Sequence, residues 1–157
     1  MNFDRTEVLY LTEEDWGHVT AANPTPQEKG NAIDYAIKRM FGGASGHHAP
    51  FDMKFPIDGC TYHEVKSSTT KWLKISPTEI EHAEWALSKG DDTLFWAIEQ
   101  LEARDEYRLF AVAKFSKFHH RLQRSEYDLY NVKRGEAWVE EPGYFINKYV
   151  MAEYAEV

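Results

Sequence analysis

Residues 51–69 constrain the fold most, because two runs of alternating side chains flank the turn signal Asp58-Gly59. Alternation with a period of two is typical of β-strands, and an Asp-Gly pair between two such runs is typical of a β-hairpin. Glycine suits the left-handed position that closes a three-residue loop with a bulge. We therefore predict an antiparallel hairpin whose loop comprises residues 57–59, so that Pro56 faces Cys60.

The same register brings two acidic residues together. Counting back from the turn, Asp52 faces Glu64, and Lys66 lies on the same face as Glu64 because side chains alternate along a strand. The opposite face carries Phe51, Met53, Phe55, His63 and Val65. One face of the hairpin is therefore predicted to pack into the core, with a hydrogen-bonded histidine at position 63. The other face is predicted to carry a cluster of charge.

Helix-start signals stand on both sides of the hairpin. Thr25-Pro26-Gln27-Glu28 and Ser76-Pro77-Thr78-Glu79 each combine an N-cap, a proline at the first helical position and a capping-box glutamate. We predict helices over 26–41 and 77–89, and strands at 7–12, 72–75, 94–101, 107–115 and 144–150, although 94–101 also fits a helix. This order predicts an α/β fold with a central mixed sheet flanked by helices.

Two carboxylates placed opposite each other in a sheet repel, so the charged face needs a compensating positive charge. A divalent cation such as Mg²⁺ supplies it, since Mg²⁺ prefers oxygen ligands and commonly binds one or two carboxylates with water and phosphate oxygens. Asp52 and Glu64 are the candidate ligands, with the main-chain carbonyl of Val65 beside them. Lys66 could hold a water or stabilise charge developing on phosphorus. The pattern predicts phosphodiester hydrolysis; an ordinary salt-bridged strand face is the alternative.

These residues resemble the PD-(D/E)XK nuclease superfamily, the restriction-endonuclease-like enzymes. The resemblance is carried by Pro50-Phe51-Asp52 and Glu64-Val65-Lys66, with a helix before the hairpin and a strand and a helix after it. It implies a restriction-endonuclease-like core over residues 26–115 and an Mg²⁺-dependent or Mn²⁺-dependent endonuclease. In that family the aspartate and glutamate bind the metal and the lysine assists the attacking water. DNA is the expected substrate, and a homodimer would cut both strands.

Glu28 has two interpretations that the sequence leaves open. Many members of the superfamily carry a metal-binding glutamate on the helix before the hairpin, and the resemblance implies that role for Glu28. The same residue occupies the third helical position of the capping box that Thr25 begins, which accounts for it on helix stability alone.

Composition limits the class of protein further. The chain has 157 residues, 43% of them hydrophobic, and no linker or repeat, which predicts one domain over residues 1–157. Its single cysteine, Cys60, cannot form an intramolecular disulfide. No stretch approaches the roughly 18 apolar residues of a membrane span. We therefore expect a cytoplasmic protein that does not enter the membrane.

A formal net charge of −8 argues against binding nucleic acid through bulk positive charge, so any such contact must be local. The best local candidate is the segment 114–124, where basic residues are interleaved with aromatic ones that could stack on bases. Its cations are Lys114, Lys117, Arg121 and Arg124. A solvated edge or helix face is the alternative interpretation of this segment.

Two further functions stay open on the sequence. An acidic protein without catalytic activity could bind or inhibit a basic partner, although the Asp, Glu-X-Lys trio argues against that class. A nuclease that cuts RNA is compatible with every feature above, because DNA and RNA differ in groove shape and 2′-hydroxyl contacts that the sequence does not report.

Overall fold

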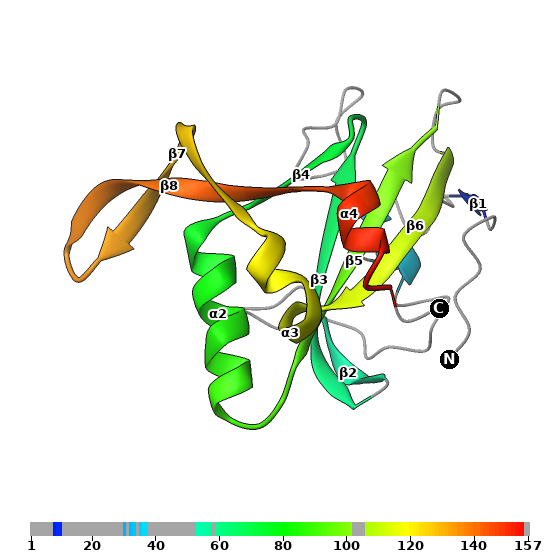
Figure 1. Ribbon diagram of the computed structural model, residues 1–157, viewed down its shortest axis with the longest axis horizontal. Helices are drawn as coiled ribbons and strands as arrows, with labels where there is room; N and C mark the ends of the chain where they lie inside the picture. The colour runs from blue at the N-terminus through cyan, green and yellow to red at the C-terminus, as the bar shows by residue number, and fades with distance from the viewer. Residues whose placement is uncertain are drawn as a thin grey trace.

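The computed structural model describes residues 8–10, 30, 32–33, 35–37, 53–57, 59–101 and 106–155 (Figure 1). The described residues between 30 and 37 are helical. The strands are β1 (Val8–Tyr10), β2 (Met53–Ile57), β3 (Cys60–Ser68), β4 (Trp72–Ile75), β5 (Thr93–Gln100), β6 (Glu106–Lys114), β7 (Gln123–Arg134) and β8 (Ala137–Asn147). The helices are α2 (Pro77–Ser88), α3 (Phe115–Phe118), the 3₁₀ turn η1 (His119–Arg121) and α4 (Lys148–Ala152). Within this part of the chain, every helix is too short or too polar to span a membrane.

The strands form two sheets. The larger has the order β1-β6-β5-β3-β2 and is mixed, because β3 and β5 run parallel while the other neighbours are antiparallel. The smaller sheet has the order β4-β8-β7 and is antiparallel. The chain reaches β5 from β3 through β4 and α2, the kind of crossover that parallel pairing requires. The fold is therefore α/β with a mixed sheet flanked by helices, as predicted.

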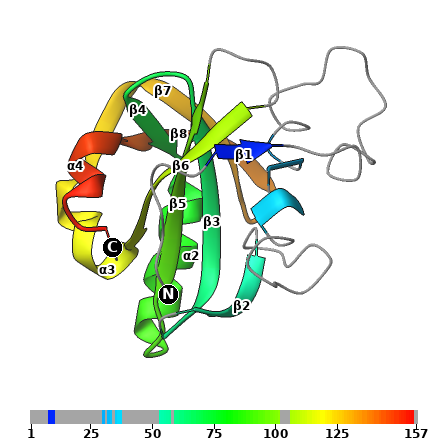
Figure 2. The same ribbon diagram turned by 90° about the vertical axis from the view of Figure 1, so that its right-hand side faces the viewer.

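Helices cover both faces of the larger sheet (Figure 2). On one face, Phe95 and Ala97 of β5 pack with Ile80 and Ala83 of α2 and with residues of α3 and α4. On the other face, residues of β5 and β6 pack with helical residues between 30 and 37. The face of β3 that carries Glu64 and Lys66, which was predicted to carry a cluster of charge, is also covered, because α2 lies over it.

The hairpin has the predicted register away from its turn. Met53 pairs with His63 and Lys54 pairs with Tyr62, as the sequence indicated. Side chains alternate between the two faces along both strands. The register at these positions is therefore set by the side-chain pattern of the whole hairpin and not by its loop alone.

The turn itself differs from the prediction. Ile57 pairs with Cys60, so the expected pairing of Pro56 with Cys60 is wrong, and the register shift lies between Lys54 and Ile57 inside β2. Gly59 has φ of 78°, the left-handed conformation expected of it. The extra residue is therefore absorbed as an irregularity in the strand, and the connection is one residue shorter than predicted.

Helix α2 begins as its sequence specifies. The Ser76 hydroxyl accepts a hydrogen bond from the Glu79 backbone N–H (3.2 Å), and the Glu79 carboxylate accepts one from the Ser76 backbone N–H (3.1 Å). Pro77 occupies the first turn, where its missing N–H leaves no helical bond unmade. The segment 94–101 is the strand β5, and its helical alternative is wrong.

The C-terminal region corrects another expectation. The strand predicted at 144–150 is the end of the longer β8, and the chain turns into α4 after Asn147. The Asn147 side chain accepts a hydrogen bond from the Tyr149 backbone N–H (2.9 Å) and so caps α4. The apolar residues in 144–150 favoured a strand over the whole segment. The Asn147 side chain instead accepts a hydrogen bond from a backbone N–H that a helix start leaves without a partner in the helix, and so it favours a helix from Lys148 onward.

Candidate functional site

Strand β3 places Glu64 and Lys66 on one face of the sheet. In the parallel pairing with β5, Glu64 lies beside Phe95 and Lys66 beside Ala97. Both β5 residues belong to the core under α2. The predicted sharing of one face by Glu64 and Lys66 therefore holds, and that face points toward α2.

Glu64 is a buried carboxylate, with 2% of its surface exposed. Its neighbour His63 points to the opposite face, where it is fully buried and accepts a hydrogen bond at Nδ1 from Nε1 of Trp96 (3.0 Å). The prediction of a hydrogen-bonded core histidine at position 63 is confirmed, and His63 is thereby committed to the core. The alternation along β3 thus separates a structural histidine from the candidate catalytic residues.

Lys66 forms an ion pair with Glu79, the capping-box glutamate of α2. Burial alone would raise the pKa of Glu79, but the charge of Lys66 and hydrogen bonds from Lys66 and Ser76 lower it below its ordinary value of 4.5. Glu79 is therefore ionised at neutral pH. A single carboxylate both caps the helix and holds the Lys66 ammonium in place.

The remaining predicted ligands are Asp52 and Glu28, and both lie outside the described residues. Val65, whose carbonyl was a third candidate, lies in β3 between Glu64 and Lys66. Within the described ranges, no three His, Cys, Asp or Glu side chains gather as a group that could hold a metal ion. Of the predicted centre, the structure therefore brings together Glu64 and Lys66.

A cavity of about 590 Å³ opens beside Lys66, where β3 ends and β4 begins. Its polar lining includes Lys66, Lys74 and Gln100, and its apolar lining includes Val65 and Trp72. Lys66 therefore reaches a space large enough for a ligand of small-molecule size.

The hydroxyl-rich turn between β3 and β4 lines the same cavity. The Ser68 hydroxyl lies within hydrogen-bonding distance of the carbonyls of Thr70 and Trp72 (both 2.9 Å) and accepts a bond from the Thr70 backbone N–H (3.0 Å). The Thr70 hydroxyl accepts from the Trp72 backbone N–H (3.2 Å). The Ser68 and Thr70 hydroxyls thus fix the turn, while Ser67 and Thr69 are exposed and line the cavity.

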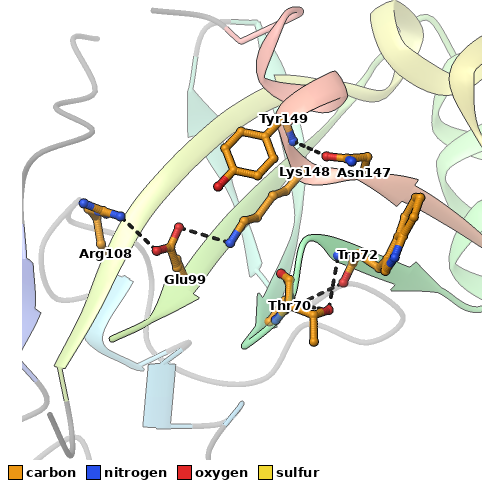
Figure 3. A network of polar contacts seen from close by, with 8 residues as sticks. Thr70, Trp72, Glu99, Arg108, Asn147, Lys148 and Tyr149 are labelled. Carbon is orange, nitrogen blue, oxygen red and sulfur yellow. Dashed lines mark hydrogen bonds and ion pairs between the residues drawn. The ribbon is translucent and has the colours of Figure 1, made fainter. Parts of the chain in front are cut away.

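Glu99 is the centre of a second charge cluster, which is partly buried on the same face of the sheet. In the β3–β5 register, Glu99 lies beside Ser68. Its carboxylate accepts hydrogen bonds from Lys148 (3.1 Å) and Arg108 (2.8 Å), as Figure 3 shows. Burial would raise the pKa of Glu99, but these two cations lower it. Lys148 also lies over the Phe110 ring, 5.0 Å from its centroid. One carboxylate oxygen bonds to Lys148 of α4 and the other to Arg108 of β6, so Glu99 joins α4 and the neighbouring strand and is a structural residue.

The basic segment 114–124 does not present its phenylalanine rings to solvent. Phe115 and Phe118 are 1% and 0% exposed and belong to the core, so the interpretation that they stack on bases is wrong. Arg121 is bonded to the Tyr154 hydroxyl (3.1 Å) and lies 3.6 Å from the Glu153 carboxylate. Lys117 and Arg124 are exposed. Lys114 is half-buried at the end of β6. The buried aromatic residues of this segment therefore anchor α3, and three of its four cations lie on the surface.

Two residues of the site were missed by sequence reasoning. Glu79 was assigned to helix capping alone, because the sequence explains it completely at that level. Trp72 was placed on a strand without a role. For Trp72 the available signal was its position, two residues after the hydroxyl-rich segment that follows Lys66. No comparable signal marked Glu79, whose pairing with Lys66 depends on how α2 packs.

No protein-family model matches this chain, and no curated protein matches it either.

Proposed function

We propose that this protein is a metal-dependent nuclease that hydrolyses phosphodiester bonds, with DNA as its substrate. The observation that carries the proposal is that Glu64 and Lys66 share one face of β3 while Lys66 lines a cavity. A carboxylate and a lysine so arranged supply a metal ligand and a cation that can meet a phosphate.

The order of elements supports a restriction-endonuclease-like core. Helical residues between 30 and 37 precede the β2–β3 hairpin, and β4 and α2 follow it. Strand β5 then pairs with β3 in parallel. These elements are the ones that the resemblance to the PD-(D/E)XK superfamily requires around its acidic residues and lysine.

The oxygen donors of the proposed centre fit a hard divalent cation. Glu64 is a buried carboxylate, and burying an ionised carboxylate is costly unless positive charge or hydrogen-bond donors compensate for it. Asp52, Glu64 and the carbonyl oxygen of Val65 would hold Mg²⁺ or Mn²⁺, with Glu28 as a further candidate. A bound cation would polarise the phosphoryl group and lower the pKa of a water ligand.

Lys66 has a more specific role than the sequence alone assigned to it. The Lys66 ammonium group is held in an ion pair by the ionised Glu79 carboxylate. We therefore assign Lys66 the task of a fixed cation that stabilises the negative charge developing on the phosphate as water attacks. Glu79 acts as a positioning residue, since its carboxylate forms the ion pair that holds the Lys66 ammonium group.

The proposal is tested by incubating the protein with supercoiled plasmid and with single-stranded circular DNA, in Mg²⁺, in Mn²⁺ and in EDTA. Cleavage is expected in either metal and not in EDTA. Lys66→Ala and Glu64→Gln should each lower the rate by roughly 10²–10³-fold, as removal of one group that stabilises transition-state charge commonly does.

Lys133→Ala is the matched control, because Lys133 is an exposed lysine on β7, outside the cavity lining. It should cleave as wild type does. Thermal unfolding of each variant checks that the fold is intact. Cleavage that survives EDTA, or that Lys66→Ala leaves unchanged, would contradict the proposal.

The second candidate is a binding protein without catalytic activity. It is favoured by the exposure of Tyr127 and Trp138, at 93% and 69%, on the β7–β8 hairpin. Large exposed aromatic side chains can mark an interaction surface. Absence of cleavage under every metal condition, for DNA and for RNA substrates alike, would favour this candidate.

A further inference from the structure

The cavity beside Lys66 combines two kinds of wall. Trp72 contributes an indole, with Val65 and Ile33 as further apolar lining. Lys66, Lys74 and Gln100 contribute cations and an amide. A ligand that fits both must carry an apolar plane and negative charge, and a nucleotide has both in its base and its phosphate.

The size of the cavity limits what can enter it. At about 590 Å³ it lies in the middle of the range of small-molecule pockets, roughly 300–1,000 Å³. One or two nucleotides are ligands of that size. Enzymes with such pockets reach a base only when it is unpaired, either in a single strand or flipped from a duplex.

The charge of the protein also favours a single-stranded ligand over a duplex. Duplex binding depends on neutralising many phosphates with clustered Lys and Arg, whereas this chain has a net charge of −8. Among the described residues that line the cavity, the cations are Lys66 and Lys74. Lys74 lies 3.4 Å from Asp128 in an exposed ion pair, which is weak enough to give way to a phosphate. Single-stranded nucleic acid is bound largely by stacking on aromatic side chains and needs fewer cations.

Trp72 is held by hydrogen bonds of its backbone and by contacts of its ring, one of them with the Lys71 ammonium, which lies 5.3 Å from the ring centroid. Its backbone N–H donates to the Thr70 hydroxyl, as Figure 3 shows. Its carbonyl oxygen lies 2.9 Å from the Ser68 hydroxyl. Phe145 of β8 packs edge-on against its ring, with centroids 5.3 Å apart. The indole is nevertheless 38% exposed. Because this ring is already held in place, binding a base to it costs little further conformational entropy of the side chain.

We propose that the cavity receives an unpaired nucleotide of single-stranded DNA, with its base stacked on Trp72 and with Lys66 and Lys74 as the cations available to its phosphates. The inference rests on the proposed nuclease function and narrows its substrate to single strands. Gln100 is then the lining residue whose amide can hydrogen-bond to a base edge.

The experiment measures binding and cleavage separately. Binding of fluorescein-labelled oligo(dT), alone and annealed to oligo(dA), is followed by fluorescence anisotropy in EDTA, where no cleavage is expected. The proteins are wild type, Trp72→Leu, Trp72→Phe and Trp138→Leu. Trp138 is the matched control, because its indole is exposed on β8 and does not line the cavity.

Wild type should bind the single strand at least about ten-fold more tightly than the duplex. Trp72→Leu should weaken single-strand binding by about ten-fold, the usual effect of losing one base-stacking ring, while Trp72→Phe and Trp138→Leu should lose little. Melting temperatures close to that of wild type show that Trp72→Leu still folds.

The outcomes separate the two proposals. Equal or tighter binding of the duplex, or unchanged binding by Trp72→Leu, overturns the single-strand inference even if metal-dependent cleavage is found. Tighter binding of the matching RNA oligonucleotide overturns the assignment to DNA. If no substrate is cleaved but binding depends on Trp72, the nucleotide site stands and the nuclease proposal fails.

Discussion

The sheet face under α2 buries a side chain that can carry charge, whereas the β7–β8 hairpin exposes large aromatic side chains. On β3 a carboxylate, Glu64, is 2% exposed, whereas Tyr127 and Trp138 on the hairpin expose 93% and 69%. Burying charge is costly and is often associated with function, while single aromatic residues on a surface are common in stable proteins. We therefore place the proposed chemistry on the sheet face and predict that the hairpin surface can be altered without affecting it.

The largest effect should come from metal. If Asp52 and Glu64 bind one cation, Mn²⁺ at a hundred times its dissociation constant should stabilise wild type by about 2.7 kcal/mol, because the ion binds only the folded state. Asp52→Asn should gain much less from Mn²⁺. In EDTA the variant should melt at a higher temperature than wild type, since it removes one of the two carboxylates that the sequence predicts to face each other and so relieves their repulsion.

Thermal melts of both proteins in EDTA and in Mn²⁺ provide the measurement. An ordinary salt-bridged strand face gives the opposite pattern: Asp52→Asn would lose up to about 1 kcal/mol, and metal would change neither curve. That pattern would remove the basis for placing chemistry in the sheet.

A smaller effect is expected at Glu79. Glu79→Gln keeps an acceptor for the Ser76 N–H but removes the ion pair with Lys66, so it should cost about 1.5–3 kcal/mol, the range for hydrogen bonds to charged groups. Ser76→Ala is the control, because it removes the cap, at about 1 kcal/mol, and leaves the ion pair. Only Glu79→Gln should also slow cleavage.

The pH dependence of this pair has a definite sign. The pKa of Glu79 is lowered in the folded protein, so its contribution to stability is complete above the ordinary value of 4.5 and is lost as the pH falls through the folded value. The difference in stability between wild type and Glu79→Gln should therefore shrink in acid. Melts over a pH series measure it, and a difference that grows below pH 4.5 would contradict the assigned pairing.

The smallest effect should come from the hairpin surface. Tyr127→Ser and Trp138→Ser should change the free energy of unfolding by no more than about 0.5 kcal/mol and leave cleavage unchanged. Val132→Ala on the same strand is the contrasting variant, because Val132 is 3% exposed and its truncation should cost roughly 1–2 kcal/mol. Loss of cleavage in Trp138→Ser would show that the two regions are not independent.

Features that depend on a few consecutive residues could be predicted from the sequence. The capping box at Ser76 and the left-handed Gly59 depend on local hydrogen bonds and backbone sterics. The pairing of Met53 with His63 follows from alternation on two adjacent strands. The placement of Glu64 and Lys66 on one face belongs to the same group.

The features that were missed depend on packing between distant parts of the chain. The ion pair of Lys66 with Glu79 forms only because α2 lies over β3, and local capping had already explained Glu79. Phe118 looked available for stacking, but the core that buries it is assembled from several separate elements. Tertiary burial decided these cases, and no local pattern encodes it.

The parallel pairing of β3 with β5 also has a kinetic consequence. Contacts such as Glu64 beside Phe95 join residues that are far apart in sequence, and they form only after β4 and α2 have been looped out between them. Closing such a long loop costs conformational entropy before the contacts that offset this cost have formed. Chains that depend on contacts of this kind therefore fold slowly. Helix α2, with its own cap, can form transiently within microseconds, and we expect the surroundings of Lys66 to be completed near the end of folding.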